Sequence, residues 1–147
     1  MTTRNILIAN GVNLDLLGRR EPTIYGKQDL ESLEIGLRQY EKEQAGRVSL
    51  SFFQSNEEAA FLVKLSEGWD GIVLNPGAWT HTSLALADRL AGLAVPFVEV
   101  HISNLSSRES FRQHSYCAPY AWGIVSGFGF IGYRVALEGL LCKLEAI

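Results

Sequence analysis

The stretch DGIVLNPGAWTHTSLALADRLAGLAVPFVEVH, residues 70–101, carries the pattern that decides the fold. It begins with the short apolar run DGIVLNPG, which is typical of a strand buried on both faces. The segment HTSLALADRLAGL then has helical periodicity, with Leu86 and Leu90 on one face and Leu84 and Asp88 on another. A second apolar run, VPFVEVH, follows. The stretch therefore predicts a strand, a helix and a parallel strand.

The same alternation extends in both directions along the chain. Further strands are predicted at residues 5–10, 47–55 and 121–127, and further helices at 29–46, 55–68 and 130–147. Ser55 stands three residues before Glu58, as in a capping box at a helix start. Residues 106–115 are expected to form a loop with one helical turn. We predict one α/β domain over residues 1–147, a flavodoxin-like, doubly wound, five-stranded parallel sheet of order 2-1-3-4-5.

Composition excludes several classes of protein. The 147 residues are 47% hydrophobic and 20% charged, as in an ordinary globular domain. The net charge of −3 argues against a nucleic-acid partner, and no apolar run is long enough to cross a membrane. The N-terminal residues lack a signal-peptide pattern, and two widely spaced cysteines, Cys117 and Cys142, fit reduced thiols, so we expect a cytoplasmic protein. The three histidines lack metal-ligand spacing, so no metal is expected.

Polar side chains follow three of the predicted strands, where each strand ends. The first strand is followed by Asn13, Arg20 and Tyr25, the third by Asn75 and His81, and the fourth by the set His101, Ser103, Asn104, Arg108 and Arg112. The second strand gives only Gln54 and Ser55, on the outer side of the point where strand order reverses. Because ligands of such sheets bind at that point, the sequence predicts a binding crevice beyond strands one, three and four.

Each candidate also has a structural reading. Tyr25 is about as well explained as a surface aromatic residue, and Arg19 with Arg20 as a solvated pair. His81 can serve as a helix cap, and His101 as a hydrogen-bonded core histidine. Arg108 and Arg112, one helical turn apart, can both face solvent.

Two further local patterns bear on the site. Glu99 and His101 lie beside each other at a strand end, and strand alternation leads us to expect their side chains on different faces. GFGFIG, at residues 127–132, matches a dinucleotide-binding fingerprint, but the chain ends before the second strand and acidic residue that such a fold requires. We therefore interpret these glycines as a tight turn before a closely packed last helix.

Five motifs, in order along nearly the whole chain, resemble those of the type II 3-dehydroquinate dehydratases, or type II dehydroquinases. They are NGVNLDLLGRREPTIYG, NPGAWTHTS, EVHISN, SRESFRQHSY and GFGFIGY. The resemblance implies a flavodoxin-like lyase that removes water by anti-elimination from 3-dehydroquinate, through an enolate, to give 3-dehydroshikimate. It also implies no cofactor, metal or Schiff base, a homo-oligomer commonly built as a dodecamer of four trimers, and a place in the shikimate pathway or quinate catabolism.

The resemblance also suggests a role for each site residue. Tyr25 corresponds to the base, Arg20 to the cation that keeps it ionised, and Asn13 to the residue that positions an enolate-stabilising water. His101 corresponds to the acid that protonates the departing hydroxyl, supported by Glu99. The residues implied in substrate binding are Asn75, His81, Ile102, Ser103, Arg112 and, reaching a neighbouring subunit, Asp88.

The chemistry of this set is consistent. A free tyrosine has a pKa near ~10, and an adjacent guanidinium lowers such a pKa by roughly 1–3 units. The segment that carries Arg20 and Tyr25 is then a lid with Gly18 and Gly26 as hinges. Four positions depart from the family pattern without removing a required group: Val12, Asp15, Trp79 and Ser106.

Three other functions were weighed against the lyase. An FMN carrier needs a hydroxyl-rich phosphate loop, and a phospho-receiver needs clustered acids at the strand ends, and the sequence offers neither. The remaining alternative is a weak or silent homologue retained as an assembly or binding module. The intact set of Tyr25, Arg20, Asn13 and His101 argues against that alternative.

Overall fold

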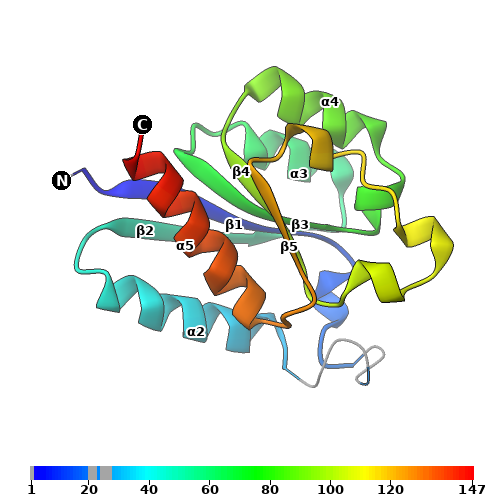
Figure 1. The fold of residues 1–147 in the computed structure, drawn as a ribbon, viewed down its shortest axis with the longest axis horizontal. Helices are drawn as coiled ribbons and strands as arrows, with labels where there is room; N and C mark the ends of the chain where they lie inside the picture. The colour runs from blue at the N-terminus through cyan, green and yellow to red at the C-terminus, as the bar shows by residue number, and fades with distance from the viewer. Residues whose placement is uncertain (1, 20–22, 24–27) are drawn as a thin grey trace.

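The computed structural model describes residues 2–19, 23 and 28–147, which form a sheet between two layers of helices (Figure 1). All strand pairs are parallel and the order is β2-β1-β3-β4-β5, which confirms the predicted doubly wound fold. The strands are β1 (Arg4–Val12), β2 (Val48–Gln54), β3 (Gly71–Gly77), β4 (Phe97–His101) and β5 (Gly123–Ser126). The helices are α2 (Leu30–Glu43), α3 (Glu58–Leu65), α4 (Leu84–Leu93) and α5 (Ile131–Glu145).

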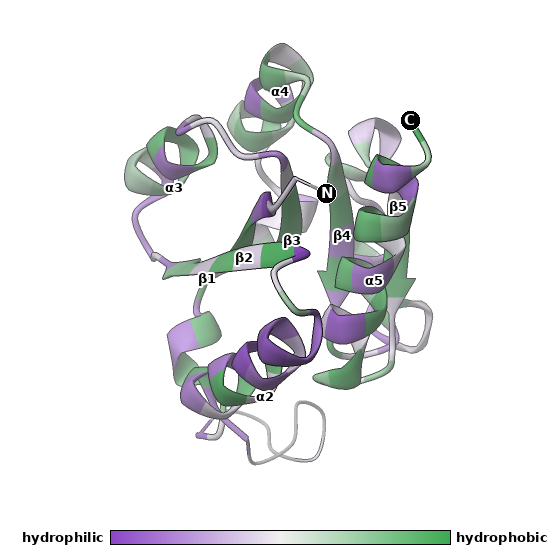
Figure 2. Ribbon diagram, turned by 90° about the vertical axis from the view of Figure 1, so that its left-hand side faces the viewer, coloured by the Kyte–Doolittle hydropathy of each residue, from purple (hydrophilic) through white to green (hydrophobic). Residues whose placement is uncertain are grey.

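Each face of the sheet has its own hydrophobic core. Ile6 and Ile8 of β1 pack on one face with residues of α2 and α5, such as Leu137. Leu7, which points the other way from the same strand, packs with α3 and α4 through residues such as Phe61. Figure 2 shows the mostly green β3 and β4 between these helices. Burial on both faces explains why the strands read as continuous apolar runs in the sequence.

The N-termini of α4 and α3 differ in whether a serine side chain caps the helix. Ser83 caps α4 by accepting a hydrogen bond from the Leu86 N–H at 2.9 Å. The capping box predicted at Ser55 and Glu58 is wrong, because α3 begins at Glu58 with Glu57 as its N-cap residue. Ser55 instead accepts from the Glu57 N–H at 3.0 Å, which closes a local turn before the helix.

The backbones of β1 and β3 approach each other closely where both strands end. A Cβ added to Gly11 would lie 2.3 Å from the Pro76 carbonyl oxygen. Gly77 has φ +63°, and a Cβ there would lie 2.5 Å from the Val12 carbonyl oxygen. Both positions therefore require glycine, and the contact draws the loops after β1 and β3 together.

Two glycines of residues 127–132 form hydrogen bonds to the backbone at the end of β4, in agreement with the interpretation of this motif as a tight turn. Gly127 and Gly129 have φ of +97° and +63°. Their N–H groups donate to the carbonyl oxygens of His101 at 3.2 Å and Ile102 at 3.0 Å. The loop after β4 contains two 3₁₀ turns, Leu105–Ser107 and Ser110–Arg112, where the sequence predicted one helical turn.

Candidate active site

A cavity opens at the carboxyl ends of β1, β3 and β4, where the strand order reverses. The space between its lining residues, including space continuous with solvent, is about 660 Å³. Its lining residues come mainly from the turn after β1 and from the loops that follow β3 and β4. The residues that line it are Val12, Asn13, Leu14, Leu16, Leu17, Asn75, Gly77, Ala78, His81, His101, Ile102, Ser103, Leu105, Arg108 and Arg112.

Most of the site residues suggested by the sequence surround this one cavity. Those brought together are Asn13, Asn75, His81, His101, Ile102, Ser103 and Arg112. Glu99 lies behind His101, whereas Asp88 is exposed on α4 and does not line the cavity. Tyr25 and Arg20 lie outside the described residues, and Arg19 is exposed.

His101 and Glu99 form a buried pair at the end of β4. The imidazole Nε2–H donates to Glu99 Oε2 at 2.7 Å, and the two side chains are only 6% and 1% exposed. The expectation that they point to different faces was wrong. Residues two apart in a strand share a face, because side chains alternate at every single position. Since Nε2 is occupied, proton exchange between His101 and a ligand in the cavity must use Nδ1.

His81 is oriented by the chain rather than serving as a cap. Its Nδ1–H donates to the carbonyl oxygen of His114 at 2.8 Å, while Ser83 caps α4. Burial, the main cause, lowers the pKa of His81 below its ordinary value. At neutral pH the ring is therefore neutral, and Nε2 can accept a hydrogen bond in the cavity.

Arg108 and Arg112 turn inward, in contrast to the solvent-facing alternative. Their side chains are 8% and 17% exposed, and both line the cavity. Glu109 bridges them, with carboxylate oxygens 3.2 Å from Arg108 Nε and 3.0 Å from Arg112 Nε. The hydrogen bond from Arg112 is the main cause that lowers the pKa of Glu109 to about 2. Arg108 also donates to Ser103 Oγ at 2.9 Å. Two guanidinium groups suit a ligand that carries a carboxylate.

A buried network that the sequence did not suggest holds Asn75. Its Nδ2 donates to the Tyr133 hydroxyl at 2.9 Å, and that hydroxyl donates to Asn10 Oδ1 at 2.5 Å. Asn75 Oδ1 accepts from the Gly77 N–H at 3.1 Å. Burial raises the pKa of Tyr133, so it stays a neutral hydroxyl. The motif GFGFIGY contains Tyr133, but only the fold shows that its phenol reaches across to β1 and β3.

Asn13 is held in an unusual backbone conformation by the loop after β2. Its φ of 67° is left-handed, a region that asparagine tolerates better than most residues. The Asn13 N–H donates to Asn56 Oδ1 at 2.8 Å, and Gln54 Nε2 donates to the Gly11 carbonyl at 3.1 Å. The second strand was expected to contribute only on the outer side, whereas its loop supports the turn that carries Asn13.

Across residues 2–19, 23 and 28–147, no three side chains of His, Cys, Asp and Glu gather in a way that would hold a metal ion. None of the helices in these ranges is both long and apolar enough to cross a membrane.

Comparison with known proteins identifies the family. The family model for class II dehydroquinase matches residues 4–141. A 3-dehydroquinate dehydratase of Polynucleobacter asymbioticus is 48% identical over 145 residues, which cover 96% of both chains. One from Parasynechococcus marenigrum is 51% identical over 144 residues, or 96% of this chain and 97% of the relative. The crystal structure of a type II dehydroquinase from Butyrivibrio crossotus superposes with a TM-score of 0.89 at 40% identity, covering 94% of this chain and 97% of that one. The chain therefore belongs to the class II dehydroquinase family.

Proposed function

We infer that the chain is a hydro-lyase that removes water from 3-dehydroquinate to give 3-dehydroshikimate. The observation that carries this conclusion is the buried His101–Glu99 pair facing a cavity with two inward arginines, in a chain of this family. The comparisons give no support to a silent assembly module. We further propose that the protein acts in the shikimate pathway or in quinate catabolism, in the cytoplasm.

Tyr25 is the base in this proposal, and it removes the proton beside the ketone. At a pKa near ~10 only about one tyrosine in a thousand is ionised at pH 7, so the base needs a cation beside it, a role we give to Arg20. Two other tyrosines suit the role poorly. Burial raises the pKa of both Tyr40 and Tyr133, which is the wrong direction for a base. Asn13 positions a water that stabilises the enolate formed by proton removal.

His101 is the acid that protonates the departing hydroxyl. Glu99 holds its Nε2–H, so the ring has a fixed orientation from which Nδ1 can deliver a proton. An anti-elimination, which the family resemblance implies, requires the base and the acid to act from opposite faces of the substrate ring. No step in this sequence requires a cofactor, so the polar groups of the chain do all the proton transfer.

The remaining groups bind the substrate. Arg112 supplies a guanidinium for the carboxylate, and neutral His81 accepts a hydrogen bond from a ring hydroxyl. Asn75 and the Ile102–Ser103 segment line the same cavity. Asp88 is exposed on α4, which suits a residue that reaches the site of a neighbouring subunit. On the family resemblance, we also propose a homo-oligomer assembled from trimers, with a dodecamer as its full size.

The decisive experiment follows the near-ultraviolet absorbance of the conjugated enone product after 3-dehydroquinate is added. Tyr25→Phe should lower kcat by about 10²–10⁴-fold, the usual worth of a general base. Tyr120→Phe, which changes an exposed tyrosine, is the matched control and should keep the wild-type rate. An undiminished rate in Tyr25→Phe would refute the assignment of the base. Inactivation by borohydride in the presence of substrate would instead indicate a Schiff-base route.

A further inference from the structure

Ser115 does not line the cavity, but its side chain contacts Glu99, the buried carboxylate partner of His101. The Ser115 hydroxyl donates to Glu99 Oε1 at 2.8 Å, and the other oxygen, Oε2, accepts from His101 Nε2 at 2.7 Å. A continuous path of hydrogen bonds therefore runs from Ser115 through Glu99 to His101. Ser115 lies 16 positions from Glu99, in the segment that leads from the loop after β4 towards β5.

The burial of Glu99 makes the serine contact consequential. The carboxylate is 1% exposed, so solvent contributes little to it and each oxygen needs a donor from the protein. His101 serves one oxygen and Ser115 the other. Two donors at fixed positions also define the plane of the carboxylate, and this plane determines how the imidazole is turned towards the cavity.

The same short segment orients the second histidine of the site. The His114 carbonyl accepts from His81 Nδ1 at 2.8 Å, and the Tyr116 N–H donates to the Thr80 carbonyl at 3.0 Å. Residues 114–116 thus contact His81, its neighbour Thr80 and the carboxylate partner of His101. The His114 carbonyl orients the ring of His81. The Ser115 side chain orients the Glu99 carboxylate, which in turn holds the ring of His101.

We propose that Ser115 is a positioning residue for the reaction, acting through Glu99 to fix His101 with Nδ1 towards the substrate. The proposal rests on the proposed function, in which His101 is the acid. Ser115 also has a plain structural contact, because its hydroxyl accepts from the Ala118 N–H at 3.0 Å. A test must therefore separate loss of this cap from loss of the carboxylate contact.

A double-mutant cycle makes that separation. Ser115→Ala should lower kcat about tenfold, as expected for a lost hydrogen bond to a charged group, and change KM less than about twofold. In a Glu99→Gln background the same substitution should have little further effect on kcat, because the charged carboxylate through which Ser115 acts is then a neutral amide. Equal effects of Ser115→Ala in the two backgrounds, or no effect in wild type, would overturn the proposal.

Three further variants separate a loss of stability from a loss of the Ser115 hydroxyl. Ser83→Ala removes a comparable backbone cap at α4 and should lower the unfolding midpoint without lowering kcat. Ser115→Thr keeps the hydroxyl and should restore kcat to within about threefold of wild type. If Ser115→Ala does not fold, Ser115→Cys, which keeps the size and donates only weakly, takes its place in the cycle. A Thr variant as slow as the Ala variant contradicts a role for the hydroxyl.

A spectroscopic measurement keeps this inference separate from the proposed function. The chain has three histidines, so the Nε2-bound proton of His101 can be assigned by NMR with a His101→Gln variant. We expect this proton to resonate downfield in wild type, and to shift or exchange faster in Ser115→Ala. Inactive wild-type protein would refute the lyase function, but the NMR measurement would still test the contact from Ser115 to Glu99. An unchanged proton signal in Ser115→Ala would refute the role of Ser115.

Discussion

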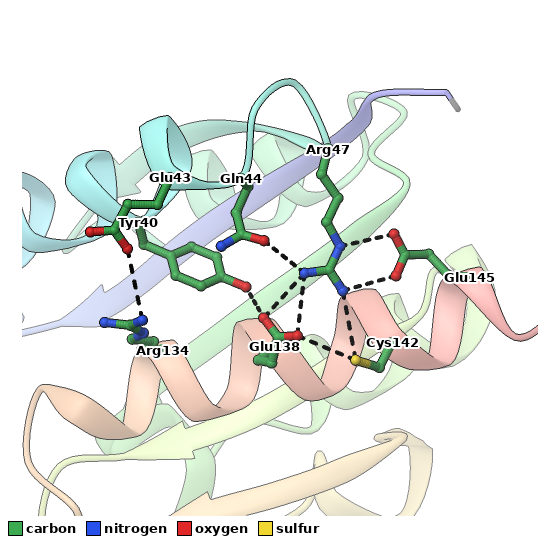
Figure 3. A network of polar contacts seen from close by, with 8 residues as sticks. All are labelled: Tyr40, Glu43, Gln44, Arg47, Arg134, Glu138, Cys142 and Glu145. Carbon is green, nitrogen blue, oxygen red and sulfur yellow. Dashed lines mark hydrogen bonds and ion pairs between the residues drawn. The ribbon is translucent and has the colours of Figure 1, made fainter.

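Two clusters of charged side chains lie at opposite ends of the sheet and differ in what their charges face. At the amino end, Arg47 lies between Glu138 and Glu145 of α5 (Figure 3). Its guanidinium donates to Glu145 at 2.9 and 2.8 Å and to Glu138 at 3.2 Å, and Tyr40 of α2 donates to Glu138. At the carboxyl end, Arg112 and His101 each have one carboxylate partner and also line a cavity.

The difference separates stabilisation from chemistry. Around Arg47 the donors end on oxygens of neighbouring side chains and on Cys142 Sγ, so the cluster joins α2, the start of β2 and α5. At the carboxyl end, His101 and Arg112 are each held by one carboxylate, and both line the cavity. A charged cluster with self-contained hydrogen bonds therefore indicates a structural clamp, and one with atoms left over towards a cavity indicates a site.

The largest effect is expected at the carboxyl end. His101→Gln removes the proposed acid but keeps a side-chain N–H that can donate to Glu99, so the buried carboxylate stays hydrogen-bonded. We expect kcat to fall by about 10²–10⁴-fold while the free energy of unfolding changes by less than about 1 kcal/mol. Steady-state rates and urea denaturation measure the two. A His101→Gln variant that loses stability but keeps its rate would show that His101 stabilises the fold and does not act in the reaction.

The reverse outcome is expected for Arg47→Met. Because the side chains of Glu138 and Glu145 are 45% and 35% exposed, solvent screens much of the attraction, and we expect a loss of about 1–3 kcal/mol in the free energy of unfolding. The turnover number should stay within about twofold of wild type. Arg89→Met, at an exposed arginine of α4, is the control and should cost less stability. A large drop in kcat would break the separation between the two clusters.

The contribution of Arg47 should also depend on pH. Hydrogen bonds from Tyr40 and Arg47 lower the pKa values of Glu138 and Glu145 respectively. A carboxyl with a lowered pKa in the folded state stabilises the protein above its unfolded pKa, near ~4.3, and this stabilisation is lost as pH falls through the folded value. The stability difference between wild type and Arg47→Met should therefore be full at pH 7 and smaller at pH 3. A constant difference would contradict an ionic clamp.

The smallest effect is expected for Glu109→Gln. The substitution weakens the bridge between Arg108 and Arg112 without removing either guanidinium. We expect KM to rise about two- to fivefold with little change in kcat, since an exposed ion pair contributes little but does orient its partners. The control is Glu67→Gln, which changes an exposed pair with Lys64 on α3. An unchanged KM would show that the arginines are held without Glu109.

Sequence patterns predicted the fold well because its signals are local. Apolar runs and helical periodicity placed all five strands and the order β2-β1-β3-β4-β5. Patterns of the same local kind failed at Ser55, where two turn geometries compete for one serine, and at Glu99, where strand alternation was applied at the wrong spacing. A sequence gives the residue types of a turn, but the backbone conformation selects among their possible hydrogen bonds.

The site was predicted in part, because loops that follow parallel strands must meet at one edge of the sheet. The residues that support the site were missed because their partners are remote in the chain. Tyr133 contacts Asn75 across 58 positions, Asn56 contacts Asn13 across 43, and Ser115 contacts Glu99 across 16. These side chains have no periodic signal, and only the folded chain shows what they hold.

The close approach of β1 and β3 at Gly11 and Gly77 limits how this enzyme can be redesigned. At both positions the obstacle to a side chain is a carbonyl oxygen, which cannot move aside by changing rotamer. Libraries that vary either glycine should therefore yield mostly misfolded clones. Changes in substrate preference have to be sought in neighbours whose side chains already line the wall, such as Val12, Leu14 and Ala78.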